Sequence, residues 1–137
     1  MRILAVDPGE KHIGIAISDP TGTVATPLAV LQHKSRSVDS AAIANLAQQN
    51  QVEMIVIGYS LDEEGLSTPQ SRRAEHLAEV IHQQYDLRVI MWDESFSTQE
   101  ARQARIAMGT TRRKRRGHLD DLAATVILQS YLDSNAK

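Results

Sequence analysis

The sequence predicts an α/β fold with a mixed five-stranded sheet, made of a three-stranded antiparallel meander and two parallel strands and flanked by helices. Two observations predict it. Short, fully apolar runs at 3–6 and 54–57 are typical of strands buried on both faces. Beyond the first three strands, strand-like runs alternate with helical apolar patterns. The 137 residues suit one domain, 1–137, with a sizeable core.

The chain opens with two apolar strands joined by a tight turn. The first strand, 3–6, runs into Asp7, and Pro8 and Gly9 break it at once. The chain then returns through isoleucines at 13, 15 and 17. Because Gly9 has no side chain, we expect a ligand or metal to approach the backbone beside Asp7. An unpaired carboxylate at the mouth of a core is costly, although Asp also simply opens many turns.

The elements that follow are marked by turn residues and apolar periodicity. Pro27 interrupts the third strand, 24–31, which therefore lies at a sheet edge or carries a bulge. A connector over 32–37 leads to a helix over 38–49 and a strand over 54–57. The acidic stretch 59–68 predicts a loop. Thr68 and Pro69 are a typical cap and first residue of a helix, in which positions 74, 77, 78 and 81 are apolar.

The last third of the chain predicts one strand and two helices. The strand covers 89–92 and ends in two acids. Ser97 and Glu100 form a capping box for a helix that reaches about position 108. The final helix, 118–131, is apolar nearly all round, so we expect it to be buried against the sheet.

Composition excludes several classes of protein. The absence of cysteine rules out disulfides and thiolate metal sites. No apolar run approaches the ~20 residues of a transmembrane helix, and the N-terminus begins with a strand rather than a secretory signal. We therefore expect a cytoplasmic protein without a membrane partner. The five histidines show no metal-ligand spacing and are expected at the surface.

Charge is unevenly distributed along the chain. The net charge is −2, but the segment 101–119 has seven Lys or Arg and no acid, so the remainder carries −9. Five of these cations are consecutive: Arg112, Arg113, Lys114, Arg115 and Arg116. They predict an exposed surface that attracts a polyanion such as nucleic acid. A merely solvated loop is the alternative.

Three acids are expected at one end of the sheet. Asp7 ends the first strand, Glu94 follows the fifth, and Asp120 opens the last helix. Ligand sites of open α/β sheets gather at the carboxyl ends of the strands. Clustered carboxylates repel one another unless a cation lies between them, and their hard oxygens suit Mg²⁺ or Mn²⁺. The alternative is a surface role for Glu94, with Asp120 and Asp121 complementing the helix dipole.

The residues also resemble a known family. The resemblance spans nearly the whole chain and rests on five ordered motifs: Asp7 to Ala16, Gly58 with Pro69 to Ala74, Trp92 to Glu94 with Ser97 and Thr98, the basic run, and Asp120 to Ala124 with Ile127 to Leu132. Together they resemble the YqgF (RuvX) family of the RNase H-like superfamily. The sequence departs from the family pattern at two places. Ser95 stands where Arg is common after the Glu, and Tyr59 and Ser60 follow Gly58 where Leu-Pro is usual.

The resemblance implies an RNase H-like fold and a metal-dependent nuclease. Family members are described as nucleases that process the 5′ end of precursor 16S ribosomal RNA, in ribosome biogenesis, and as Holliday junction resolvases. The family's catalytic and metal-binding acids fall on Asp7, Glu94 and Asp120, and Asp121 is the neighbouring alternative to the last.

The expected reaction is phosphodiester hydrolysis with two Mg²⁺ or Mn²⁺ ions. Asp7 would bridge both ions, while Glu94 and Asp120 would each complete one site. The basic run would bind backbone phosphates without reading bases, so binding should weaken with salt.

The sequence does not decide between precursor rRNA, alone or within ribosomal particles, and branched DNA as the substrate. It also does not decide between a monomer and a dimer. Two other functions fit the sequence. One is nucleotide binding by a phosphate loop of the actin-like ATPase type, and the other is RNA binding without catalysis.

Overall fold

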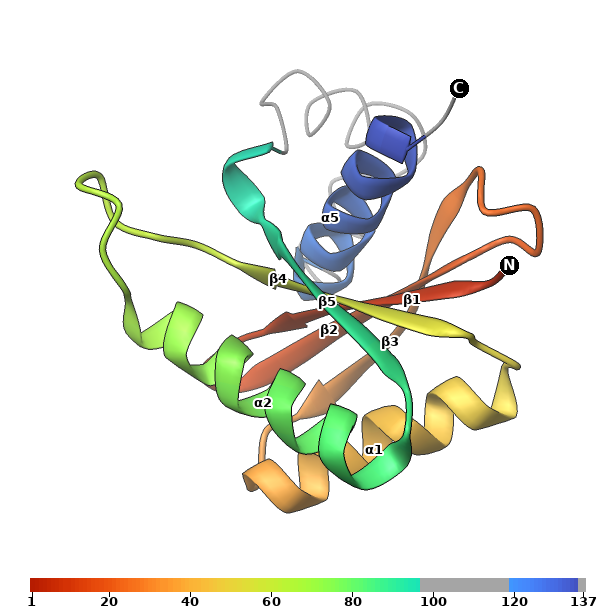
Figure 1. The fold of residues 1–137 in the computed structure, drawn as a ribbon, viewed down its shortest axis with the longest axis horizontal. Helices are drawn as coiled ribbons and strands as arrows, with labels where there is room; N and C mark the ends of the chain where they lie inside the picture. Colours follow the sequence, from red (N-terminus) through yellow and green to blue (C-terminus); the bar gives the residue numbers. More distant parts are fainter. Residues whose placement is uncertain (97–118, 136–137) are drawn as a thin grey trace.

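Five strands form one mixed sheet in the computed structural model, which describes residues 1–96 and 119–135 (Figure 1). The strand order across the sheet is β3-β2-β1-β4-β5. The elements along the chain are β1 (Ile3–Pro8), β2 (His12–Ser18), β3 (Ala25–Gln32), α1 (Arg36–Gln49), β4 (Met54–Tyr59), α2 (Pro69–Tyr85), β5 (Arg88–Asp93), a 3-10 turn (Glu94–Phe96) and α5 (Leu119–Asn135).

The pairing confirms the predicted meander followed by two parallel strands. β2 pairs antiparallel with both β1 and β3. β4 pairs parallel with β1 and with β5, so β1, β4 and β5 all run in one direction. Their carboxyl ends therefore lie along the same edge of the sheet, the edge at which the sequence predicts a site.

Helices cover both faces of the sheet (Figure 1). α1 and α2 pack together on one face, and α5 packs across β1, β2 and β3 on the other. Side chains alternate between the faces as the strand period requires. In β1, Leu4 and Val6 belong to the core beneath α1 and α2, whereas Ile3 and Ala5 belong to the core beneath α5.

The first helix begins earlier than the sequence suggested. The Ser35 side chain accepts from the Val38 backbone, so the helix begins at Arg36 rather than at 38 and takes two residues from the expected connector. Asp39, in the first turn, is only 4% exposed. Its carboxylate accepts from the Lys34 backbone and contacts the His33 ring. The buried acid is therefore satisfied by the loop that enters the helix.

The tight turn after β1 gives Gly9 a structural role of its own. The Gly9 backbone donates to the His12 carbonyl across 3.0 Å. A Cβ at position 9 would lie 2.4 Å from that same carbonyl oxygen. Glycine is therefore needed to close the turn between β1 and β2, and the approach of a ligand is not required to explain it.

The remaining predictions for the described residues hold with small shifts in their ends. β3 is an edge strand, with a register shift opposite Pro27. Thr68 caps α2 in a reciprocal capping box with Ser71. The loop after β4 begins at position 60, because Tyr59 still belongs to the strand. The last helix is found at Leu119–Asn135 and packs on the sheet as expected. No helix among the described residues is long and apolar enough to cross a membrane.

Two predictions lie outside the described residues. These are the helix that was expected to begin after Ser97 and end near position 108, and the basic run 112–116.

Truncation of the core between the sheet and α1–α2 should cost stability. Ile55 is completely buried in β4, so Ile55→Ala should lower the free energy of unfolding by about 2–5 kcal/mol through lost burial and a residual cavity. Urea unfolding monitored by circular dichroism measures it. The control is Leu66→Ala, because that side chain is 57% exposed and should change stability by less than about 0.5 kcal/mol. Equal effects of the two variants would contradict the described core.

Candidate active site

The parallel register brings three strand ends to one level. Val6 pairs with Ile57 in the last rung between β1 and β4, so Asp7 and Gly58 are each the next residue. Gly58 in turn pairs with Trp92 of β5. Asp7, Gly58 and Trp92 therefore lie on three adjacent strands at the carboxyl edge.

Asp7 and Glu94 lie on the face of the sheet that α5 covers. Strand alternation places Asp7 on the same face as Ile3 and Ala5, which pack beneath α5. Glu94 follows β5 directly, and its Oε1 lies 3.3 Å from the point that a Cβ on Gly58 would occupy. Asp7 and Glu94 are both half-buried. The structure thus brings two carboxylates from positions 87 residues apart to the same edge and face.

Gly58 lies between the strands that carry the two acids, and Ile127 of α5 packs against it. A Cβ there would lie 2.5 Å from Cδ1 of Ile127 as well as close to Glu94. Only hydrogen leaves room for both neighbours at this position. No local pattern in the sequence indicates this role of Gly58, since the contact with Ile127 depends on tertiary packing.

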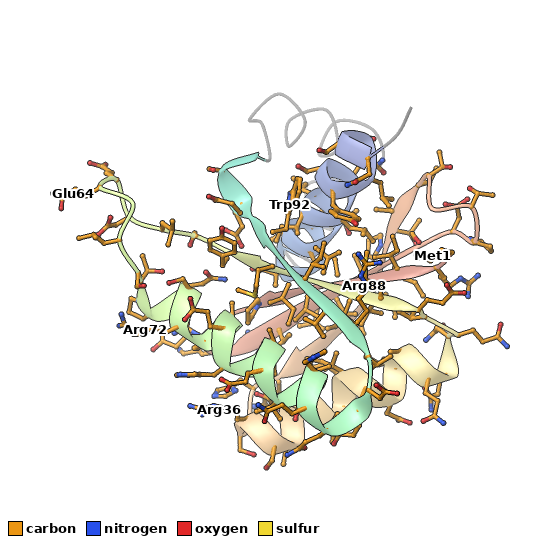
Figure 2. The ribbon with its side chains drawn as sticks, viewed as in Figure 1. Met1, Arg36, Glu64, Arg72, Arg88 and Trp92 are labelled. Atoms are coloured by element: carbon orange, nitrogen blue, oxygen red, sulfur yellow. The ribbon has the colours of Figure 1, made fainter. Side chains whose placement is uncertain are left out.

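The end of β5 is fixed against α5 by an aromatic contact (Figure 2). The rings of Trp92 and Tyr131 meet edge to face with their centroids 5.2 Å apart. The Trp92 indole also donates to the Ser130 hydroxyl across 3.3 Å. One residue beyond the indole, Asp93 accepts from the Ser95 backbone and starts the 3-10 turn that carries Glu94. These contacts restrict where the Glu94 carboxylate can lie.

A glutamine from α2 fixes the rim beyond β4. Gln70 donates to the Gly58 carbonyl at 3.0 Å and accepts from the Ser60 backbone at 2.7 Å. The Thr68 hydroxyl donates to the Ser60 carbonyl at 2.6 Å. The strand end beside the acids is therefore tied to the start of α2. Neither the Gln70 nor the Thr68 contact to Ser60 could be inferred from local sequence patterns.

The predicted site residues differ in what can be said of them. Asp7 and Glu94 are brought together as described. The backbone of Asp120 lies in the first turn of α5, but its side chain and the run 112–116 lie outside the description. Among the side chains that are described, no three acidic or histidine groups gather as a metal site. The four histidines of residues 1–96 are exposed, as predicted.

The sheet order, the helices on its two faces and the acids at the parallel edge define the RuvC-like RNase H fold. The chain superimposes on the Thermus thermophilus RuvC solved with a Holliday junction substrate, with a TM-score of 0.66 at 18% identity, covering 100% of this chain and 98% of that one. It also superimposes on the fowlpox virus resolvase solved with Holliday junction DNA, with a TM-score of 0.61 at 18% identity and full coverage of both chains.

The chain belongs to the RuvX family, described as Holliday junction resolvase, whose profile matches residues 1–134. A protein of Syntrophus aciditrophicus is 42% identical over 98% of this chain and 89% of its own length. A protein of Clostridium botulinum is 37% identical over the full length of both. Each bears the name "Putative pre-16S rRNA nuclease".

Filling the space at Gly58 should disturb the site through Ile127. Gly58→Ala should lower the free energy of unfolding by about 1–3 kcal/mol, because the new methyl overlaps Cδ1 of Ile127. Ile127→Val removes that atom and should by itself cost about 0.5–1.5 kcal/mol. The double variant should lose clearly less stability than the sum of the two, as measured in a double-mutant cycle by urea unfolding. Strict additivity would contradict the described contact.

Proposed function

We propose that the chain is a metal-dependent nuclease that hydrolyses phosphodiester bonds in precursor 16S rRNA at its 5′ end. The observation that carries the proposal is the pair of carboxylates, Asp7 and Glu94, on one face of the parallel edge beside Gly58. Support for the substrate comes from relatives named for a pre-16S rRNA nuclease, which match nearly the whole chain. If the precursor rRNA is cleaved within ribosomal particles, the protein also binds those particles.

Asp120 is proposed as the third acid of this site. It precedes Ile127 by seven residues, or about two helical turns, so the two positions share one side of α5. Ile127 is the residue that packs against Gly58, between the other two acids. This relation supports Asp120 as the third acid over its neighbour Asp121, which lies about 100° around the helix.

The donor set fits Mg²⁺ or Mn²⁺. Asp7 and Glu94 offer hard carboxylate oxygens, and two half-buried negative charges on one edge favour a bound cation over mutual repulsion. Asp7, Glu94 and Asp120 would together hold two such ions. Such ions, when bound, supply an activated water and stabilise the charge that develops on the leaving 3′ oxygen. The three carboxylates would position the ions at the phosphate that is cleaved.

The basic run 112–116 is proposed to hold the nucleic acid beside the acids. It precedes Asp120 by only a few residues and carries five positive charges. Lys and Arg bind phosphates regardless of base sequence, and such binding weakens as salt rises. The run therefore supplies affinity, whereas the acids supply the reaction.

Branched DNA is a second candidate substrate. The RuvX profile is described as Holliday junction resolvase, and the fold matches two resolvases solved with junction DNA. A junction presents the same phosphates as RNA, so the same acids and cations would serve. A symmetric junction would favour a dimer.

The deciding experiment offers the purified protein a precursor-rRNA 5′ leader and, separately, a four-way DNA junction, each with Mn²⁺ or Mg²⁺. We expect cleavage of the leader that stops when the metal is chelated. Asp7→Asn should reduce the cleavage rate more than about a hundredfold while leaving RNA binding intact, because it removes a charged ligand without changing shape.

Asp86→Asn is the matched control, because Asp86 lies at the opposite end of β5 and asparagine tolerates its left-handed backbone. It should cut the leader at the normal rate. Cleavage of the junction alone would transfer the proposal to branched DNA. RNA binding without cleavage of either substrate would identify a non-catalytic module, and full activity of Asp7→Asn would refute the metal assignment.

A further inference from the structure

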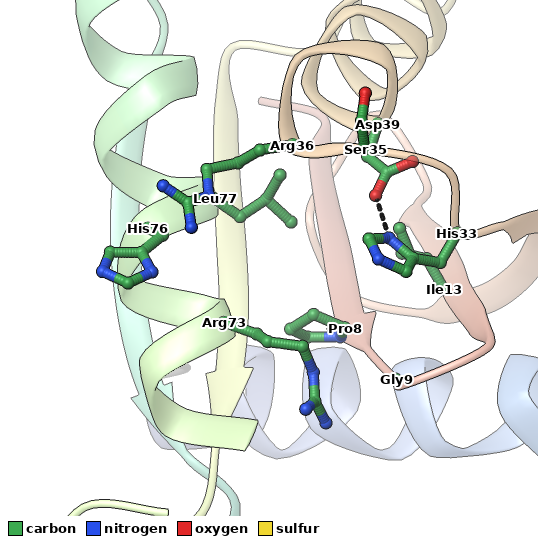
Figure 3. Close-up of a pocket in the computed structure, with 10 residues that line it drawn as sticks. All are labelled: Pro8, Gly9, Ile13, His33, Ser35, Arg36, Asp39, Arg73, His76 and Leu77. Atoms are coloured by element: carbon green, nitrogen blue, oxygen red, sulfur yellow. Dashed lines mark hydrogen bonds and ion pairs between the residues drawn. The ribbon is translucent and has the colours of Figure 1, made fainter. Parts of the chain in front are cut away.

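A pocket of about 330 Å³ opens on the opposite face of the sheet, beside the same edge (Figure 3). Three parts of the chain line it: the hairpin formed by the end of β1, the turn after it and the start of β2; the start of α1 with the loop before it; and the second and third turns of α2. Its apolar wall is formed by Pro8, Ile13 and Leu77. Neither Asp7 nor Glu94 lines this pocket.

The pocket is lined by positive charge. Arg36 and Arg73 reach it from α1 and α2, and His76 lies beside them. Among the described residues, Asp39 is the one carboxylate that lines the pocket, and both of its oxygens are engaged: one contacts the His33 ring and the other accepts from the backbone of the preceding loop. Neither guanidinium is therefore neutralised by this acid. The N-terminus of α1 adds a positive dipole end, because the helix begins at Arg36.

Arg73 carries an unsatisfied donor. Its Nε is buried and finds no hydrogen-bond acceptor among the described residues. A buried N–H without a partner costs free energy, so its presence calls for an explanation such as a ligand or an ion. Figure 3 shows the Arg73 side chain running from α2 past Pro8, toward the end of β1. Its planar fork is suited to the oxygens of a phosphate.

Two residues that line the pocket, Pro8 and Gly9, directly follow Asp7 in the sequence. Because strand residues alternate between faces, Asp7 belongs to the α5 side and Pro8 to the side of α1 and α2. A flexible strand that crosses the edge of the sheet would meet carboxylates on one face and guanidiniums on the other.

We propose that Arg36 and Arg73 each bind a backbone phosphate of the substrate strand, because their guanidiniums point to different parts of the pocket (Figure 3), and that neither phosphate is the one that is cleaved. This inference rests on the proposed nuclease function for its choice of ligand, since a free phosphate ion offers the same oxygens. The pocket holds the strand in register across the edge while the acids act on the neighbouring phosphate. It reads no base, because both guanidiniums recognise phosphate oxygens.

The test measures RNA binding without cleavage. In an Asp7→Asn background with EDTA, the affinity for a short labelled single-stranded RNA is followed by fluorescence anisotropy over a range of salt. Arg73→Gln and Arg36→Gln should each weaken binding about three- to tenfold. Each should also lower the slope of log affinity against log salt by about one, because one phosphate contact is lost.

Arg72→Gln is the matched control. Arg72 is exposed, adjacent in sequence to Arg73, and does not line the pocket (Figure 2). It removes the same charge, so a purely general attraction would make all three variants equal and would overturn the proposal. Arg73→Lys keeps the charge but loses the fork and should bind with intermediate affinity. Thermal unfolding checks that each variant folds, and Arg36→Gln carries the test should Arg73→Gln unfold.

Two further arms separate this proposal from its alternatives. Inorganic phosphate that raises the unfolding temperature in an Arg73-dependent way, with no change in RNA affinity on substitution, would identify a free-anion site and overturn the proposal. If the wild type cuts RNA but the pocket variants bind like Arg72→Gln, only the pocket assignment fails. If the wild type cuts nothing while the pocket variants bind RNA weakly, the nuclease function fails and the pocket stands.

Discussion

The register of the three parallel strands is the constraint on which the rest of the site depends. Once Val6 pairs with Ile57, Asp7 and Gly58 must reach the carboxyl edge together. The pairing of Gly58 with Trp92 then places Glu94 just beyond the same edge. A slip of one residue in either strand pair would send an acid to the other face. Buried apolar residues on both faces hold that register.

The edge has two chemically different faces. Carboxylates lie on the side of α5, and guanidiniums from α1 and α2 lie on the other side. Cleavage of a polyanion uses both faces. Cationic groups hold its phosphates, and carboxylates recruit a metal ion to the phosphate that is cleaved. The net charge of −2 hides this separation, because acids and bases nearly cancel over the whole chain.

Local patterns predicted the positions of the acids, and tertiary packing decided the rest. The apolar run broken by Pro8 and the strand-like run 89–92 were enough to place two strand ends, and with them Asp7 and Glu94. The sequence suggested ligand approach as the reason for Gly9, and the structure adds a second reason, because the His12 carbonyl leaves no room for a side chain there. The roles of Gly58 and Arg73 depend on helices distant in sequence, so no periodicity could reveal them.

The central claim is that Asp7 and Glu94 share a divalent cation. Anomalous diffraction from crystals grown with Mn²⁺ tests it most directly, because the signal locates the metal independently of activity. The account predicts a manganese peak in contact with both carboxylates, and its loss in crystals of the Asp7→Asn variant. Manganese bound elsewhere, with the two carboxylates turned apart and neither touching metal, would contradict it.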